Sequence, residues 1–275
     1  MALRTDIAYE YDGSFEGFLC CVYEAFYRRE APAIFSEEGQ ALLYPTRRVQ
    51  TDGRARKVLG SIREKIGREL ADFLPLCLFT CLPQKEEHML RLIRLGYQVG
   101  PGILEMMAHP YVNILRKAVF HLKHEAHLLT GFVRFCEAEG ALYAVIHPKN
   151  RVLALMEPHF CSRFSKERFL IFDETHRQAL VHQPGRAGIF PLKEFSLPVA
   201  GREEQEYREL WQLFYRTMEV PGRRNEVLRR TLMPKRYWAE LTEFGTPAGA
   251  IPLKDYQKAC GRKDRQESEP SFGAP

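Results

Sequence analysis

One short stretch in the middle of the chain concentrates side chains that carry acid–base or metal chemistry. It holds His121, His124 and His127, with Glu125 among them and Arg134 shortly after. Histidines three residues apart can bind a metal from one helix face. However, HEAH is not the HExxH pattern, and no second cluster supplies further ligands. We therefore expect neither a metal nor a cofactor.

Glu125 and Arg134 are the members of this stretch whose positions predict apolar surroundings. On a helix, Glu125 falls at the edge of the apolar stripe, and a carboxylate there needs a partner. Arg134 falls on the apolar face of the following strand. Two interpretations stay open: a structural Glu125–Arg134 ion pair that joins helix to sheet, and a pocket in which Arg134 binds a phosphate that Glu125 orients.

A second constellation is HFCSRF, residues 159–164. His159 and Arg163 would share one face of a helical turn, and the phenylalanines would lie in the core. The Arg163 side chain is suited to contact an anion or a nucleic-acid base. The candidates for general acid–base catalysis are His159, Glu125 and His127. No P-loop, GxGxxG or GxSxG motif accompanies them, which argues against a P-loop nucleotidase, a Rossmann dehydrogenase and a serine hydrolase.

Positive charge is concentrated in two short segments, although the net charge of the chain is only +5. Residues 47–68 hold eight Lys or Arg against two acidic residues, and residues 223–236 hold six against one. Arginines beside aromatic residues suit phosphate contacts and base stacking. A solvated helix face would show the same spacing. The residues expected to bind nucleic acid, besides segment 47–68, are Arg134, Arg163, Arg223, Arg224, Asn225, Arg229, Arg230, Lys235 and Arg236.

The composition, with 45% hydrophobic and 27% charged residues, is typical of a globular protein. The seven cysteines show no CxxC spacing, which favours buried free thiols in a reducing cytosol. The chain has neither an apolar leader nor an apolar stretch long enough for a membrane helix. These features predict a cytoplasmic protein without a membrane partner.

Hydrophobic periodicity predicts an α+β fold, with helices packed around one antiparallel meander sheet. A strand over 7–11 and a helix over 15–28 open the chain, and residues 31–52 read as irregular. Helices are expected next, over 54–70, 71–82, 84–97 and 110–129. The period of the hydrophobic pattern then changes to two residues, which predicts strands over 131–137, 141–147, 152–156, 168–173, 178–183 and 188–192.

The last part of the chain returns to a helical pattern, with helices expected over 203–218 and 223–231. The final thirty residues are rich in Gly and Pro, which is typical of a disordered tail. We therefore expect three parts: a strand–helix region over 1–84, a main domain over 85–245 and the tail over 246–275.

Four segments carry a resemblance to a known family. They are residues 11–19 (YDGSFEGFL), 125–135, 159–164 and 224–238. In these segments and their order, the chain resembles a bacterial family of probable DNA metabolism or DNA-repair proteins, over about residues 7–245. From about residue 85 it resembles an uncharacterised domain that relatives carry fused to a uracil-DNA glycosylase.

The resemblance implies a role in DNA repair or modification. Shorter members of the family are typically encoded beside a radical S-adenosylmethionine (radical SAM) protein. We therefore expect a non-catalytic partner of that enzyme that binds DNA, single- or double-stranded, through its basic segments. Two alternatives stay open: a stand-alone enzyme that processes nucleotides or DNA lesions by His/Glu chemistry, and an interaction module that does not bind DNA directly.

Overall fold

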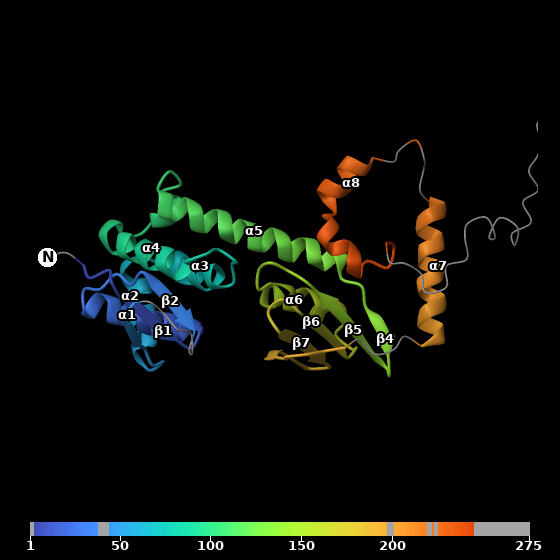
Figure 1. The fold of residues 1–275 in the computed structure, drawn as a ribbon, viewed down its shortest axis with the longest axis horizontal. Helices are drawn as coiled ribbons and strands as arrows, with labels where there is room; N and C mark the ends of the chain where they lie inside the picture. Colours follow the sequence, from blue (N-terminus) through green and yellow to red (C-terminus); the bar gives the residue numbers. More distant parts are fainter. Residues whose placement is uncertain (1–2, 38–43, 197–200, 219–221, 223–224, 245–275) are drawn as a thin grey trace, which may run out of the picture. The chain divides into compact units, whose positions relative to one another are not determined.

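A computed structural model describes residues 3–37, 44–196, 201–218, 222 and 225–244. The chain forms two compact units, residues 1–201 and residues 202–275. Both β-sheets found in the described part of the chain belong to the first unit (Figure 1).

The first sheet has three parallel strands. Its central strand is β1 (Ala8–Tyr11), which pairs in parallel with β2 (Ile34–Glu37) on one side and with β3 (Thr46–Arg48) on the other. Helix α1 (Phe15–Tyr27) connects β1 to β2, and Ser14 caps it by accepting a hydrogen bond from the Gly17 amide. The carboxyl ends of all three strands therefore meet at one edge of the sheet.

The remaining helices of this half pack on α1 and on one another. They are α2 (Arg54–Lys65), α3 (Arg68–Leu78), α4 (Lys85–Val99), the short η1 (Ile103–Glu105) and α5 (Pro110–Phe132). Their apolar faces form one core, in which Phe18, Ile62, Leu74 and Leu92 are fully buried. The long α5 begins at a proline, whose fixed φ suits a first helical turn. It packs against α3 and α4, and it also contacts α6.

The second sheet has five strands in the order β4-β5-β6-β7-β8. Their bounds are β4 (Cys136–Ala138), β5 (Ala141–Ile146), β6 (Phe169–Asp173), β7 (Gln178–Gln183) and β8 (Arg186–Pro191). Helix α6 (Leu153–Arg163) crosses over between β5 and β6, and these two strands are parallel. The other three pairs are antiparallel.

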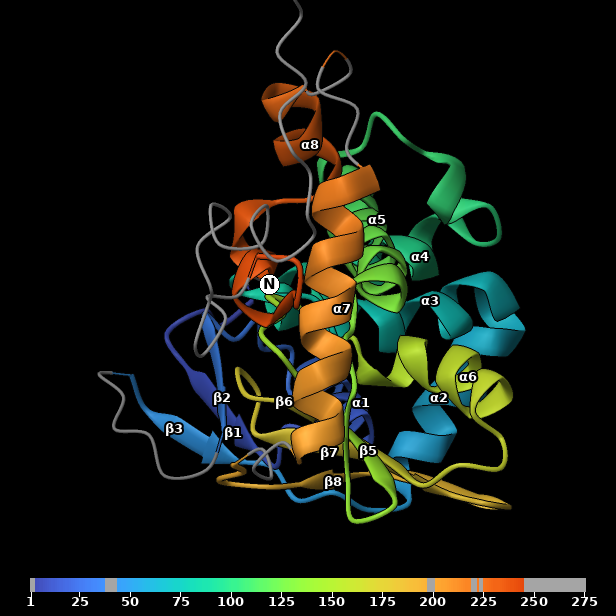
Figure 2. The ribbon, with the colours of Figure 1, turned by 90° about the vertical axis from the view of Figure 1, so that its right-hand side faces the viewer.

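The second unit is helical in its described part. Helix α7 (Arg202–Met218) is continuous (Figure 2), and α8 (Glu226–Leu232) and η3 (Lys235–Glu240) follow it. The Gln212 amide donates a hydrogen bond to the Thr242 carbonyl, at 2.8 Å. The Trp238 ring stacks on Phe244, with ring centroids 4.5 Å apart. These contacts tie α7 and η3 to the segment after them.

The expected α+β class is confirmed, but the single antiparallel meander is wrong. The protein has one three-stranded parallel sheet and one five-stranded mixed sheet. Residues 152–156, expected as a strand, contain the first turn of α6, and this helical crossover makes its flanking strands parallel. Within residues 31–52, expected as irregular, lie β2 and β3, which have only four and three residues. Strands this short show no clear two-residue period.

Other expectations have mixed outcomes. The strand expected over 131–137 is the end of α5 followed by β4, whereas the strand over 178–183 has the predicted bounds. The tail, residues 246–275, lies outside the described residues. The boundary expected at residue 84 stays a prediction.

Most of the described cysteines are buried thiols, as expected. Cys20, Cys21, Cys77 and Cys136 are buried and free. Burial raises the pKa of the Cys21 and Cys77 thiols. The exceptions are Cys81, which is free but exposed, and Cys161, which is free and half-buried. Among the helices that the structure describes, none combines the length and the apolar character needed to cross a bilayer.

Candidate nucleic-acid interface

The basic segment 47–68 forms β3, helix α2 and the start of α3. Three of its eight cations pair with carboxylates. Arg47 donates to Glu30 at 3.0 Å, Arg48 lies 4.0 Å from Glu10, and Arg54 pairs with Asp52 and Glu24. The other five have no hydrogen bond or ion pair within the described part of the chain: they are Arg56, Lys57, Arg63, Lys65 and Arg68. All five are exposed, so this surface has positive charge available for a partner.

Arg54 has a structural role in joining α2 to α1. Glu24 of α1 accepts hydrogen bonds from Arg54 and, at 2.7 Å, from Arg28. Burial raises the pKa of the Glu24 carboxyl, but the two arginine hydrogen bonds outweigh it and leave this pKa lowered. The hydrogen bond to Asp52, together with the charge of Glu24, raises the pKa of the Arg54 guanidinium. Both acidic partners of Arg54 are thus neutralised within the fold.

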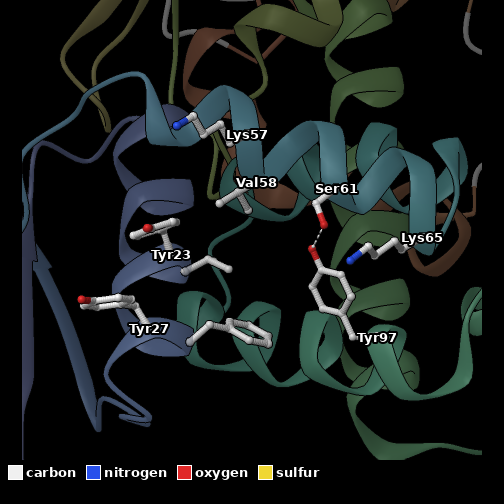
Figure 3. A pocket seen from close by; sticks show the side chains of 9 residues that line it. Tyr23, Tyr27, Lys57, Val58, Ser61, Lys65 and Tyr97 are labelled. Carbon is white, nitrogen blue, oxygen red and sulfur yellow. Dashed lines mark hydrogen bonds between the residues drawn. The ribbon is translucent and has the colours of Figure 1, made fainter.

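An open hollow of about 480 Å³ lies beside the basic helix (Figure 3). Helices α1, α2 and α4 line it, and they carry aromatic and cationic side chains toward it. Its lining includes Tyr23 and Tyr27 of α1, Lys57, Ser61 and Lys65 of α2, and Tyr97 of α4. Because the α2 residues are four apart, they form one stripe along that helix.

The aromatic rings of the hollow are ordered by contacts among themselves. Tyr23 and Tyr27 lie nearly parallel, with centroids 6.0 Å apart and an interplanar angle of 13°. Phe26 meets the Tyr97 ring edge-on at 5.5 Å, and the Tyr97 hydroxyl donates to the Ser61 hydroxyl at 2.9 Å. Tyr27 nevertheless stays 73% exposed. The hollow therefore combines a fixed wall with one largely uncovered ring.

A second hollow lies on the other side of α2, at the amino-terminal ends of α1 and α2. Glu16, Asp52 and Arg56 line it, so its charge is mixed. Beside it, Asp12 accepts hydrogen bonds from the Ser14 hydroxyl at 2.6 Å and from the Thr51 hydroxyl at 2.7 Å. Burial raises the pKa of the Asp12 carboxyl, but these hydrogen bonds prevail and lower it. The Asp12 carboxylate therefore links the loop after β1 to the loop after β3.

Glu125 is buried, as its position predicted, and its hydrogen bonds run to the loop after β5. Its carboxylate accepts from the Lys149 amide at 3.0 Å, the Asn150 amide at 2.9 Å and the Asn150 side chain at 2.6 Å. Arg134 donates to the Gly131 carbonyl at 2.9 Å. With both oxygens engaged, Glu125 holds the β5–α6 connection in place.

The other catalytic candidates lie on exposed surfaces. His127 of α5 and His159 of α6 are exposed, as is Arg163, which lies over the Phe164 ring at 5.7 Å. Exposed His124 stacks on Phe120 of the same helix face. Within the described residues, no three His, Cys, Asp or Glu side chains come together as a metal site would require.

In the second basic segment, three of the four described cations contact neighbouring side chains. Arg229 pairs with Glu226 at 2.6 Å and lies over the Trp238 and Phe244 rings. Lys235 lies 5.9 Å from the Trp238 centroid, and Arg236 lies over Tyr237.

The remaining members of this segment differ from one another. Asn225 caps α8 by accepting from the Leu228 amide at 2.9 Å. Arg230 has no hydrogen bond or ion pair to any other described residue. Arg223 and Arg224 lie outside the described residues.

Two features were missed by reasoning from the sequence. The first is the hollow itself, because its walls come from helices far apart in the chain. The signal that could have found it is the four-residue spacing of Tyr23 and Tyr27, matched by the four-residue steps from Lys57 to Ser61 and from Ser61 to Lys65. The second is His176, at the turn between β6 and β7. Its ring donates a hydrogen bond to the carboxylate of the buried Asp173, at 2.7 Å.

Comparison with known proteins places the chain in a family. No curated protein and no solved structure matches it. Residues 83–243 match the family model DUF4130, a domain of unknown function. This match begins just before α4 and extends through η3, so it includes α5 and the whole second sheet. It covers more than half of the sequence, and the chain therefore belongs to the DUF4130 family.

Proposed function

We propose that this protein binds nucleic acid through the exposed basic surface of α2 and the start of α3. The observation that supports the proposal is the set of five exposed cations, Arg56, Lys57, Arg63, Lys65 and Arg68, which the described part of the fold does not use. Phosphate oxygens are the partners that such a cluster suits, and their contacts supply most of the sequence-independent affinity for DNA.

The aromatic hollow beside α2 favours nucleic acid over an acidic protein as the partner. An acidic peptide would need only the cations, whereas nucleic acid brings phosphates and flat bases together. The hollow places Tyr23 and Tyr27 within the same lining as Lys57 and Lys65. Both kinds of contact are therefore offered on one surface.

We further propose that the protein works in DNA repair or modification as the non-catalytic partner of a radical SAM enzyme. This part rests on the resemblance to the DNA metabolism family. The partner would supply the chemistry, and this chain would hold the nucleic acid.

The first test is a salt titration of binding to single-stranded and duplex oligonucleotides, with nuclease-treated full-length protein. If all five cations contact phosphates, the logarithm of the affinity should fall with the logarithm of the salt concentration with a slope of about −4.5 for duplex and about −3.5 for single strands. No binding to either form at about 50 mM salt would contradict the proposal. Co-purification of an acidic protein partner would then support the interaction-module alternative.

A further inference from the structure

We infer that the hollow between α1, α2 and α4 receives an unstacked base of single-stranded nucleic acid, while Lys57 and Lys65 bind the flanking phosphates. This inference rests on the proposed function and adds to it the form of the ligand and the place of the base.

The ring of Tyr27 is the surface on which a base would stack. One face of this ring is turned to the parallel ring of Tyr23, and the side chain as a whole is 73% exposed. An aromatic ring this exposed contributes little to the core, yet its neighbour restricts its orientation. Stacking on a pre-oriented ring loses little side-chain entropy, and every base has a flat face to offer.

The size and wall of the hollow suit a nucleotide. Its volume of about 480 Å³ lies within the range of roughly 300–1,000 Å³ that small-molecule pockets occupy. On the α4 side, the Tyr97–Ser61 hydrogen bond and the edge-on contact between Phe26 and Tyr97 fix the wall. A base in a duplex is stacked and paired, so it could reach this hollow only after leaving the helix. The geometry therefore favours single strands.

The charges around the hollow suit an anionic backbone. Lys57 and Lys65 lie at its rim, both exposed and both without a hydrogen bond or ion pair to another described residue. The nearest acidic group on α1, Glu24, is already bound by Arg28 and Arg54. Its charge therefore does not oppose a phosphate at the lysines.

The test is a comparison of Tyr27→Ala with wild type in binding a single-stranded oligothymidine of about 20 nucleotides and a duplex of the same length. We expect Tyr27→Ala to weaken single-strand binding roughly 10-fold, since a stacked base contributes about 1–3 kcal/mol. Duplex binding should change less than about 2-fold, and Tyr27→Phe should restore single-strand affinity. An oligonucleotide with a photoreactive 5-iodouracil should crosslink to Tyr27 in the wild type.

Two controls make the outcomes distinct. Phe190→Ala removes another exposed ring (53%) from β8 of the second sheet and should leave binding unchanged. Lys57→Gln with Lys65→Gln should lower the salt slope by about 0.9 per charge for duplex and by about 0.7 per charge for single strands. If this double variant weakens binding while Tyr27→Ala does not, the proposed base site is wrong, whereas the proposed phosphate-binding surface is supported. If wild type binds neither strand form, the proposed function itself fails.

Discussion

The two basic segments of this chain resemble each other in sequence and differ in structure. Segment 47–68 and segment 223–236 both carry an excess of arginine and lysine. In the first, five cations extend into solvent without a described partner. In the second, Arg229, Lys235 and Arg236 all lie over aromatic rings of their own unit.

This difference shows that charge density alone does not identify a binding surface. A guanidinium that lies over an indole and pairs with a carboxylate has exchanged part of its hydration for contacts within the fold. Moving it to a phosphate would cost those contacts. A lysine that extends into solvent has none to lose. We therefore expect the α2 surface to carry the affinity, and the second segment mainly to stabilise its own unit.

The strongest test of this comparison removes the same number of charges from each segment. One variant replaces Arg56, Lys57, Arg63 and Lys65 by Gln, and its counterpart replaces Arg229, Arg230, Lys235 and Arg236 by Gln. We expect the first to bind DNA at least about 100-fold more weakly at about 50 mM salt, with a duplex salt slope lower by about 3.6, since each phosphate contact contributes about 0.9. The second should lose less than about 10-fold. Equal losses would show that both segments bind phosphates.

A smaller effect is expected from Arg229→Gln alone, and it concerns stability. This change removes the ion pair with Glu226 and the contacts with the Trp238 and Phe244 rings. We expect the second unit to lose about 1–2 kcal/mol of unfolding free energy. Both tryptophans, Trp211 and Trp238, lie in this unit, so their fluorescence during urea unfolding reports it selectively.

The neighbouring residue supplies the control for that variant. Arg230→Gln removes an equal charge that has no described partner, and it should leave the fluorescence transition within about 0.5 kcal/mol of wild type. DNA affinity should stay within about 3-fold for Arg229→Gln. A loss of more than 10-fold in affinity with an unchanged unfolding transition would place Arg229 in the interface instead.

The helices of this protein could be predicted from the sequence because their apolar spacing is regular. Helix α7 and the start of α5 have the expected positions, and burial of Glu125 follows from its place at the edge of the α5 stripe. Strands β2 and β3 could not be predicted in this way. They are three or four residues long, and they form only because β1 offers hydrogen-bonding partners on both sides.

The candidate site was predictable only in part, for a related reason. The charge of α2 is visible in the sequence, but which cations are paired depends on distant carboxylates. Glu24 and Glu30, which neutralise Arg54 and Arg47, come from the segment before the basic one. The hollow likewise depends on α4, whose Tyr97 lies 36 residues beyond Ser61. Such pairings are set by tertiary packing, and the spacing of neighbouring residues in the sequence does not predict them.

A stability effect of similar size concerns the cation of α2 that the fold does use, Arg54, and it should depend on pH. Glu24→Gln weakens the link between α1 and α2 and should lower the unfolding free energy by about 1–2 kcal/mol near neutral pH, since hydrogen bonds to charged groups are being lost. The pKa of the Glu24 carboxyl is lowered in the folded protein, so its stabilising contribution is present above the ordinary value of 4.5 and is lost as the pH falls through the folded value.

The difference between wild type and Glu24→Gln should therefore shrink as the pH falls below about 4.5, when measured by urea unfolding followed by circular dichroism. Carboxylates with a lowered pKa that share no partner with Glu24, such as Asp12, are present in both proteins and cancel in the difference. A constant difference between about pH 7 and pH 3 would mean that Glu24 acts by packing rather than by charge. Arg54 would then be held by the charge of Asp52 alone, and the link between α1 and α2 would not depend on an ion pair.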